Sequence, residues 1–294
     1  MTIDTLCVCG AGTMGSGIAQ AAAQAGIHTL VYDLDLSILN RARTQTEKSL
    51  ATLVERSRMT NEQATAIRSR LQYTNELQEC LADVFIEAVV ERPEVKIALF
   101  NQLAEINHGE SVFATNTSSL SVTALAQHVQ GRERVIGMHF FNPATVMKLV
   151  EVVTTPYTSP ETTETILELA RRMQKEAVLC RDAPGFIVNR VARPYYIESL
   201  RITEEGQVPF EQTDTILEAS GFRLGPFRLM DLIGNDVNYA VSCSVYEQLG
   251  RPERLRPSAI QEDKVSAGAL GRKTGTGYYS YSPSDSPPKP GGNK

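Results

Sequence analysis

A histidine and a glutamate twelve residues apart are the first candidates for chemistry in this sequence. His139 lies in the strand-like segment Val135–Phe140, and Glu151 is the only acid in the apolar segment Leu149–Val153. A carboxylate in apolar surroundings needs a partner, and an imidazole is a suitable one. A histidine held by a carboxylate at a strand end can accept the proton of an alcohol. Taken singly, each of these two residues would more often have a structural role.

A glycine-rich turn near the N-terminus offers a second kind of chemistry. Gly10-Ala11-Gly12-Thr13-Met14-Gly15 separates the apolar run Leu6–Cys9 from an alanine-rich segment with helical character. In this setting the first glycine permits a tight turn, the second lets a pyrophosphate approach the backbone, and the third allows close helix packing. The N-terminus of the helix would face the negative charge. The turn predicts a dinucleotide site, and the alternative is a glycine-rich turn that binds nothing.

An acidic residue after the next strand indicates which dinucleotide binds. Asp33 follows the second apolar run, Thr29–Tyr32, and lies 23 residues after Gly10. A carboxylate at this point accepts hydrogen bonds from the adenosine ribose and repels a 2′-phosphate. The sequence therefore predicts NAD rather than NADP.

Hydroxyl and amide residues follow a third strand candidate. The segment Phe113–Leu120 runs from apolar residues into Thr115-Asn116-Thr117-Ser118. Ligands of open α/β sheets bind at the carboxyl ends of the strands. Ser118 is therefore a candidate donor to a substrate oxygen, and capping of the following helix is the alternative role.

The surrounding sequence alternates between strand-like and helical segments, as in a doubly wound parallel sheet. Residues Leu36 to about Leu71 are periodic like helices and break near Met59, where Thr60 and Gln63 have capping-box spacing, so a helical hairpin is expected there. Further helices are expected after Pro93, Ser121 and Ser159. The remaining strand candidates are Val84–Val90, Val112–Thr115, Val135–Phe140, Leu149–Val153 and Ala177–Leu179.

Strand signals almost vanish after Pro184, and only helical periodicity continues to Gly268. We therefore expect an α/β Rossmann-type domain at 1–183 and an all-α domain at 184–282, to which the family resemblance described below assigns substrate binding and dimerisation. The segment 283–294 is rich in proline, glycine and serine, so a disordered tail is expected.

Composition excludes several classes of protein. The 294 residues include 29 basic and 34 acidic side chains, so a net charge of −5 gives no global positive field for nucleic acid or an anionic membrane. No window approaches the roughly 20 apolar residues of a membrane span. Five scattered cysteines indicate free thiols in a reducing compartment and have no metal-binding spacing. With no secretory signal at the N-terminus, a cytoplasmic protein without a bound metal is expected.

The motifs taken together resemble the L-3-hydroxyacyl-CoA dehydrogenases, especially the smaller 3-hydroxybutyryl-CoA type. The resemblance covers nearly the whole chain, and HFFNP followed by KLVEV, with PGFIVNR downstream, is highly specific. The motifs that carry it are GAGTMG, ATNTSSL, HFFNP, KLVEV, PGFIVNR, LGPFRLMDLIGND and GRKTGTGYY.

This resemblance implies a role for individual residues. His139 matches the family's catalytic base, Glu151 the acid that orients it, Ser118 the serine that contacts the substrate oxygen, and Asn189 the amide that completes the site. Ser49 falls at a position that contacts CoA, and Arg56 lies where relatives can carry lysine, which changes the geometry offered to a phosphate. Besides Gly10, Gly12, Thr13, Met14, Gly15 and Asp33, the implied NAD contacts are Glu91, Lys96, Asn116, Asn142 and Lys273.

The expected function is the NAD-dependent interconversion of (S)-3-hydroxyacyl-CoA and 3-oxoacyl-CoA, with a short acyl chain such as 3-hydroxybutyryl. The family resemblance also implies a homodimer formed through the helical domain. A local basic face on the hairpin agrees with a CoA site, although a solvated helix surface is the alternative. Two other functions stay open: a dehydrogenase of a hydroxy acid without CoA, and a non-catalytic NAD-binding protein. The basic face comprises Arg41, Arg43, Lys48, Arg56 and Arg58.

Overall fold

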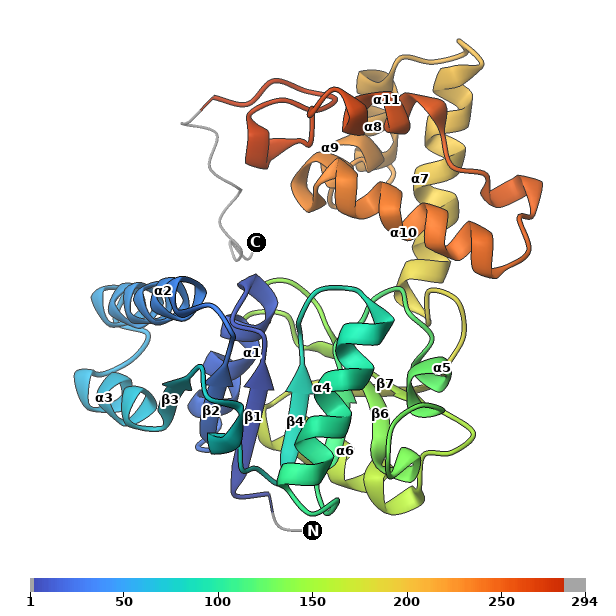
Figure 1. Cartoon of the computed structure of the whole chain (residues 1–294). Helices are drawn as coiled ribbons and strands as arrows, with labels where there is room; N and C mark the ends of the chain where they lie inside the picture. Colours follow the sequence, from blue (N-terminus) through green and yellow to red (C-terminus); the bar gives the residue numbers. More distant parts are fainter. Residues whose placement is uncertain (1–2, 283–294) are drawn as a thin grey trace. The chain divides into compact units, whose positions relative to one another are not determined.

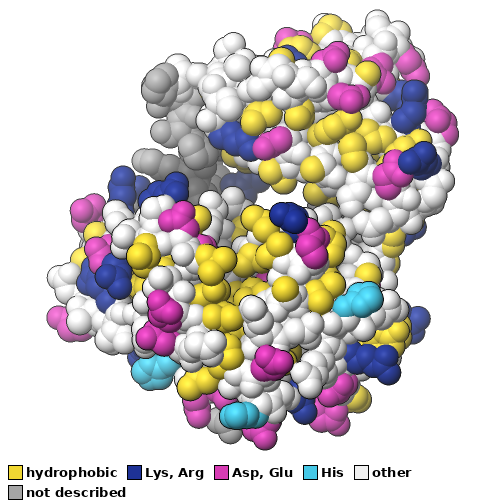
Figure 2. All heavy atoms as spheres, viewed as in Figure 1, with side chains coloured by type: hydrophobic (Ala, Val, Ile, Leu, Met, Phe, Trp, Pro, Cys, Tyr) yellow, Lys and Arg dark blue, Asp and Glu magenta, His cyan; other side chains and the backbone are white. Residues whose placement is uncertain are grey.

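The computed structural model describes residues 3–282, which form two compact units. The first unit ends at Phe186 and contains the sheet, and the second begins at Ile187 and is helical (Figure 1). On the visible face, side chains of both charge signs are interspersed over each unit (Figure 2). Among the described residues, no helix is both long and apolar enough to cross a bilayer. The predicted tail, 283–294, lies outside the described residues.

The sheet has eight strands within the described residues, in the order β3-β2-β1-β4-β5-β6-β7-β8. Neighbouring strands are parallel except for β6 and β7, which are antiparallel. The predicted doubly wound fold is therefore confirmed. The strands are β1 (Thr5–Cys9), β2 (His28–Tyr32), β3 (Leu71–Thr74), β4 (Val84–Glu87), β5 (Val112–Thr115), β6 (Val135–Phe140), β7 (Leu149–Thr154) and β8 (Glu176–Arg181).

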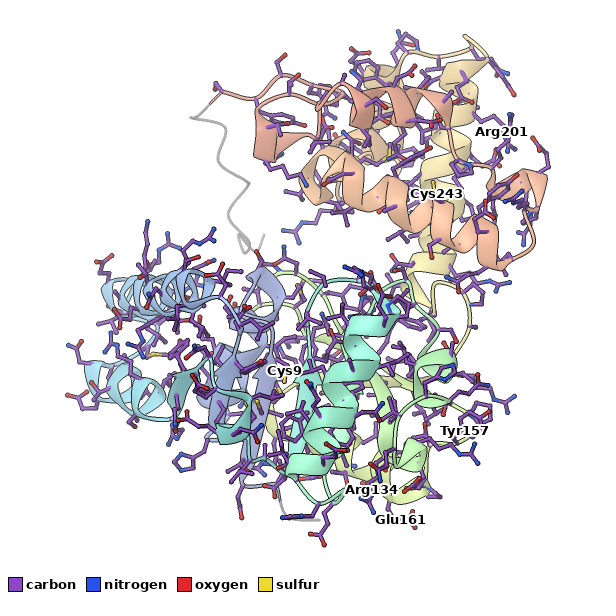
Figure 3. All side chains as sticks on the ribbon, viewed as in Figure 1. Cys9, Arg134, Tyr157, Glu161, Arg201 and Cys243 are labelled. Atoms are coloured by element: carbon purple, nitrogen blue, oxygen red, sulfur yellow. The ribbon has the colours of Figure 1, made fainter. Side chains whose placement is uncertain are left out.

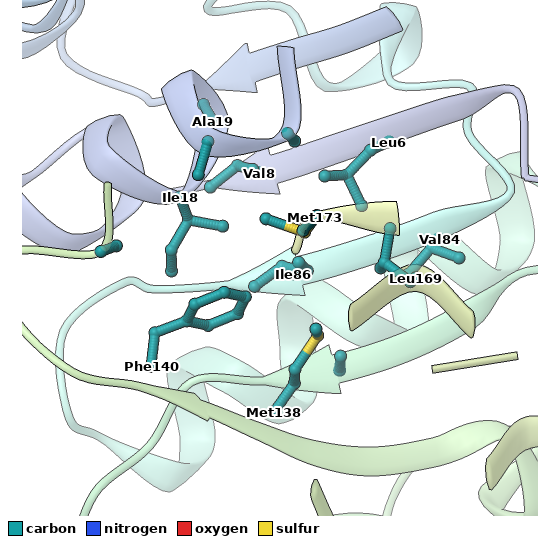
Figure 4. Packing of buried hydrophobic residues seen from close by; sticks show 14 of the residues in the cluster. Leu6, Val8, Ile18, Ala19, Val84, Ile86, Met138, Phe140, Leu169 and Met173 are labelled. Atoms are coloured by element: carbon teal, nitrogen blue, oxygen red, sulfur yellow. The ribbon is translucent and has the colours of Figure 1, made fainter. Parts of the chain in front are cut away.

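Alternating side chains of the central strands face two hydrophobic layers. Leu6 and Val8 of β1 point to one face, and Cys7 and Cys9 to the other; Cys9 lies inside the unit at the end of β1 (Figure 3). The first layer packs under α1 (Thr13–Gln24) and α6 (Pro160–Arg172), where Ile18 meets the strand residues (Figure 4). The second layer packs under α4 (Pro93–Ile106) and α5 (Val122–Ala126).

The predicted helical hairpin is confirmed as α2 (Leu36–Glu55) and α3 (Asn61–Ser69). Asp35 caps α2 by accepting the backbone N–H of Ser37. Thr60 and Gln63 form the expected capping box of α3. The hairpin leads into β3, a strand that the sequence did not predict.

Two strand limits differ from expectation for identifiable reasons. β4 ends at Glu87 rather than at Val90, because the Glu87 carboxylate accepts the N–H of Val89 and turns the chain. β3 is a short edge strand that pairs only with β2 in the described sheet, and Leu71 and Tyr73 are only half-buried. Its sequence therefore carries little of the apolar alternation on which a prediction depends.

The second unit consists of helices around two small apolar clusters. Tyr196, Phe227 and Met230 lie in one cluster, and Ile197 and Val245 in the other. The helices are α7 (Val188–Glu204), α8 (Phe210–Ala219), α9 (Pro226–Ile233), α10 (Asn235–Gln248) and α11 (Ala259–Ser266), with short 3₁₀ turns at Glu253–Leu255 and Arg272–Thr274.

Two buried aspartates hold the end of this unit in place. Asp214 accepts hydrogen bonds from the backbone N–H groups of Phe227 and Arg228 at the start of α9, and from the Tyr279 hydroxyl at 2.7 Å. Asp231 accepts the backbone N–H groups of Tyr278 and Tyr279 at 3.0 Å and the hydroxyl of Tyr281. These contacts fix the segment that carries the GRKTGTGYY motif.

Candidate active site

The glycine turn after β1 has the shape of a phosphate-binding loop. Gly10 has φ of +99°, and a Cβ there would lie 2.5 Å from the carbonyl oxygen of Ala88. A Cβ on Gly15 would lie 1.7 Å from the carbonyl oxygen of Gly10, whereas a Cβ on Gly12 would meet nothing within 4 Å. Gly10 and Gly15 are therefore required for packing, but Gly12 leaves room for a ligand.

The start of α1 can receive an anion at this opening. Gly12 is the N-cap residue and provides no side-chain cap, so the first N–H groups of α1 have no capping partner. Thr13 is exposed and Met14 is half-buried in the first turn. The free N–H groups and the helix dipole both favour a phosphate.

Asp33 and two exposed apolar side chains complete the fit to a dinucleotide. The Asp33 carboxylate accepts the N–H of Ala11 at 2.8 Å and the N–H of Asp35 at 3.0 Å, which joins the end of β2 to the glycine turn. Leu34 and Val90 are 81% and 60% exposed and follow the two strands that flank β1. Apolar surface at this edge of the sheet suits an adenine ring, and ribose binding by Asp33 stays a prediction.

His139 and Glu151 meet as expected. They lie opposite each other in the β6–β7 register, with 2.7 Å between His139 Nδ1 and Glu151 Oε2. Their side chains are 7% and 1% exposed, and the rings of Phe141 and Phe186 pack at 4.7 and 5.7 Å from the imidazole. An ionised carboxylate can only accept, so this contact orients the ring with Nδ1 toward Glu151 and leaves Nε2 on the opposite side.

The loop after β5 lies beside this pair. The Asn116 side-chain oxygen accepts the N–H of Phe140 at 2.8 Å, which ties the loop to the residue after His139. Ser118 is half-buried, and its N–H donates to Glu91 Oε1 at 3.3 Å. Asn116, Ser118 and His139 therefore share the carboxyl edge of the parallel strands.

Lys96 is buried rather than open to a ligand. Its side chain is 1% exposed, and its ammonium group lies 2.7 Å from Glu87 Oε1 and 2.9 Å from Glu91 Oε2. Burial raises the pKa of Glu87. Burial acts in the same direction on Glu91, but Lys96 and the Thr117 hydroxyl outweigh it and lower the pKa of that carboxyl. Contact of Glu91 and Lys96 with NAD stays a prediction.

Glu87 is the residue at this edge that the sequence analysis missed. It is the only acid in the apolar strand Val84–Glu87 and is completely buried. Glu151 was recognised because it is the only acid in an apolar strand. The same criterion, applied to β4, would have found Glu87.

The remaining candidates lie on other elements. Asn142 is exposed after β6, Arg56 is exposed at the end of α2, and the Ser49 hydroxyl accepts the side-chain amide of Gln20 at 3.1 Å. In the helical unit, the carbonyl oxygen of Asn189 in the first turn of α7 accepts a hydrogen bond from the Arg193 guanidinium at 2.9 Å. Lys273 in the same unit forms an ion pair with Asp236 at 2.6 Å.

Comparison with known proteins agrees with this arrangement. Residues 5–183 match the family model described as "3-hydroxyacyl-CoA dehydrogenase, NAD binding domain", and residues 185–281 match "3-hydroxyacyl-CoA dehydrogenase, C-terminal domain". The chain belongs to the 3-hydroxyacyl-CoA dehydrogenase family. The Rossmann-type unit is accordingly an NAD-binding domain.

Individual relatives of this dehydrogenase family are similar over most of the chain. The 3-hydroxyadipyl-CoA dehydrogenase of Escherichia coli is 45% identical over 283 residues, which cover 96% of this chain but 60% of that protein. A probable 3-hydroxybutyryl-CoA dehydrogenase of Deinococcus radiodurans is 39% identical, with 93% and 99% covered. The crystal structure of a Ralstonia eutropha (S)-3-hydroxybutyryl-CoA dehydrogenase is 33% identical with a TM-score of 0.91, covering 96% of this chain and 100% of that one.

Proposed function

We propose that this chain is an NAD-dependent dehydrogenase that interconverts (S)-3-hydroxyacyl-CoA and 3-oxoacyl-CoA. The observation that carries the proposal is the buried His139–Glu151 pair, at 2.7 Å, on the strand edge that also carries the glycine turn and Ser118. A pair held only for stability would have no need of a dinucleotide turn and a serine at the same edge. Family membership of both domains gives further support.

The proposed reaction uses the free nitrogen of His139. In the oxidation, His139 Nε2 takes the hydroxyl proton of the substrate, and the Glu151 carboxylate stabilises the imidazolium that forms. The Ser118 hydroxyl holds the reacting oxygen, and the family resemblance adds the Asn189 amide as a further substrate contact. When bound, NAD supplies the hydride acceptor. In the reverse direction, protonated His139 returns its proton to the oxygen.

The cofactor would be held mainly by backbone groups. The free N–H groups after Gly12 would bind the pyrophosphate, and Asp33 would bind the adenosine ribose. The open space above Gly12 supports this assignment. The family resemblance adds Glu91, Lys96, Asn116, Asn142 and Lys273 as further contacts.

The acyl chain is proposed to be short, with 3-hydroxybutyryl-CoA as the first candidate. The names of the Deinococcus and Ralstonia relatives support this choice. The E. coli relative is named for 3-hydroxyadipyl-CoA, which carries a terminal carboxylate, so this substrate is the second candidate. Ser49 and Arg56 would contact the CoA moiety.

We further propose a cytoplasmic homodimer in which residues 184–282 supply the interface and part of the substrate site. Exposed apolar side chains on the helical unit support an interface, and hydrophobic side chains gather on its visible face (Figure 2). Light scattering after size-exclusion chromatography tests the dimer. The free cysteines among the described residues support a reducing compartment. The exposed apolar side chains include Val191, Ile216, Phe222, Leu232, Ile233 and Val237.

The decisive experiment is a spectrophotometric NADH assay with three substrates. Acetoacetyl-CoA and 3-oxoadipyl-CoA test the two acyl chains, and free acetoacetate tests the dehydrogenase without CoA. We expect kcat/KM for a CoA thioester to exceed that for acetoacetate by at least about tenfold, equivalent to about 1.4 kcal/mol. Turnover of acetoacetate alone would favour the hydroxy-acid alternative, and no turnover with any of the three would contradict the proposed activity.

A further inference from the structure

We propose that Glu87 is a positioning residue for Ser118, acting through Lys96 and Glu91. The inference rests on the proposed function for the role of Ser118. It concerns a continuous set of contacts from the buried end of β4 to the loop after β5, all within the first unit. Neither the family resemblance nor the sequence analysis gives Glu87 a role.

Glu87 joins three neighbouring elements at the carboxyl edge. Its Oε1 atom accepts the N–H of Val89 and the ammonium of Lys96, each at 2.7 Å. Its Oε2 atom accepts the hydroxyl of Thr115 at 2.7 Å. One completely buried carboxylate therefore connects the end of β4, the first turn of α4 and the last residue of β5.

Lys96 passes this constraint to Glu91. A buried ammonium is stable only with paired charges, because removing it from water costs several kcal/mol. The Lys96 ammonium has two carboxylates within 3 Å, at 2.7 Å to Glu87 and 2.9 Å to Glu91. The Glu91 side chain is 38% exposed, so the ion pair with buried Lys96 ties a partly exposed carboxylate to the interior. The buried Glu87–Lys96 pair holds it in one orientation.

Glu91 in turn holds the loop that carries Ser118. Its Oε1 atom accepts the Thr117 hydroxyl, the Ser119 hydroxyl at 2.9 Å and the N–H of Ser118 at 3.3 Å. Residues 116–120 belong to no helix or strand, so these contacts replace the regular hydrogen bonds that would otherwise fix the backbone. Glu87 also holds Thr115, the residue just before this stretch, so it acts on the loop both directly and through Lys96 and Glu91.

Replacement of Glu87 by glutamine separates this role from simple packing. Glu87→Gln keeps the side-chain shape but removes the charge that orients Lys96. In the background with Ser118 intact, we expect kcat/KM for acetoacetyl-CoA to fall about tenfold or more, since small errors in orientation are costly in catalysis. In the Ser118→Ala background, Glu87→Gln should lower kcat/KM less than about twofold, because the group that Glu87 positions is already absent.

A matched control and a second variant secure the comparison. Glu94→Gln removes another acid in the first turn of α4, one that pairs with Arg92 at the surface, and it should leave kcat/KM unchanged. If Glu87→Gln does not fold, Thr115→Val removes the direct contact of Glu87 with Thr115, together with the hydrogen bond from the Thr117 N–H, and enters the same double-mutant cycle. Equal losses with and without Ser118, or no loss at all, would overturn the proposal.

Hydrogen exchange tests the same inference without any turnover. Faster exchange in the peptide covering residues 115–121 of Glu87→Gln, with unchanged exchange in β1, supports the positioning role. Unchanged exchange in residues 115–121 overturns it. If the wild-type protein turns over none of the acyl-CoA substrates, the proposed function fails, and the exchange data alone decide whether Glu87 orders the loop.

Discussion

His139 on β6 lies directly opposite Glu151 on β7, in a strand pair that runs antiparallel within an otherwise parallel sheet. Residues directly opposite each other on antiparallel strands point to the same face. The 2.7 Å contact is thus set by backbone register on two buried strands and needs no loop to form it. A pair placed on such a scaffold keeps its geometry when ligands come and go.

Removal of the base should separate cofactor binding from chemistry. We expect His139→Gln to lower kcat by about 10²–10⁴-fold, the range of general acid–base catalysis, with nearly unchanged NADH affinity. Glu151→Gln should also slow turnover, and the double variant should lose less than the product of the single losses. Steady-state kinetics and NADH fluorescence titration measure these quantities. A fully active His139→Gln protein would refute the mechanism, and multiplicative losses would refute the pairing.

The alkylation rate of the nearby Cys180 thiol should report the charge of Glu151. Burial and the charges of Glu151 and Asp182 raise the pKa of Cys180 to about 11. Because a negative neighbour disfavours the thiolate, Glu151→Gln should lower this pKa and speed alkylation of Cys180 at a fixed pH below 11. Mass spectrometry of the Cys180 peptide follows the rate. Cys243, on α10 of the other unit, is the internal control and should react at an unchanged rate.

The alkylation experiment also has an outcome that would contradict the proposed role of Glu151. If Cys180 reacts equally fast in the wild type and in Glu151→Gln, Glu151 carries no charge in the free protein. The hypothesis that a charged carboxylate orients His139 would then be wrong.

Replacement by alanine should lower the stability of the protein at Gly15 and its NADH affinity at Gly12. In Gly15→Ala the new Cβ would collide with the carbonyl oxygen of Gly10, so the free energy of unfolding should fall by at least about 1–3 kcal/mol. In Gly12→Ala the Cβ has open space in the free protein, so stability should be retained while NADH binding weakens by about tenfold or more. Denaturant titration and NADH titration measure the two effects. Normal NADH affinity in Gly12→Ala would argue against a pyrophosphate at this turn.

Cofactor preference should depend on the charge of Asp33. We expect NADPH to support at least about tenfold lower kcat/KM than NADH, or about 1.4 kcal/mol. Because Asp33 also accepts the N–H of Ala11, Asp33→Asn is a better test than alanine: its amide oxygen can still accept one of the two N–H groups that the carboxylate holds, while the charge is removed. The NADH preference should narrow in this variant. Equal use of both cofactors by the wild type would contradict the assignment.

Arg56 should matter only for substrates that carry the CoA nucleotide. Arg56→Ala is expected to raise KM for acetoacetyl-CoA more than KM for a truncated pantetheine thioester, since only the former has phosphates for the guanidinium. Arg68, exposed in the last turn of α3 and outside the basic face, provides a matched control in Arg68→Ala. Equal increases in KM for both thioesters would give Arg56 a structural role.

The sequence predicted structural features correctly where the signal lies within one segment. The glycine turn, Asp33 and the capping box of Thr60 are local patterns, and each is present in the structure. β3 was missed because an edge strand owes its conformation to pairing with β2, which no local pattern reports. The contact between Glu87 and Lys96 was missed for a similar reason: it joins a strand end to the first turn of a helix, and only the fold brings the two together.

Asp231 links the unfolding of the segment Tyr278–Tyr281 to the unfolding of the helical unit. The segment Tyr278–Tyr281 cannot detach independently, because its release would remove three hydrogen-bond donors from buried Asp231 and the Tyr279 hydroxyl from buried Asp214. A buried carboxylate that loses donors without replacement is destabilised, so this segment opens together with the helices that it covers. In its resistance to endoproteases, the segment Tyr278–Tyr281 should behave as part of the helical core.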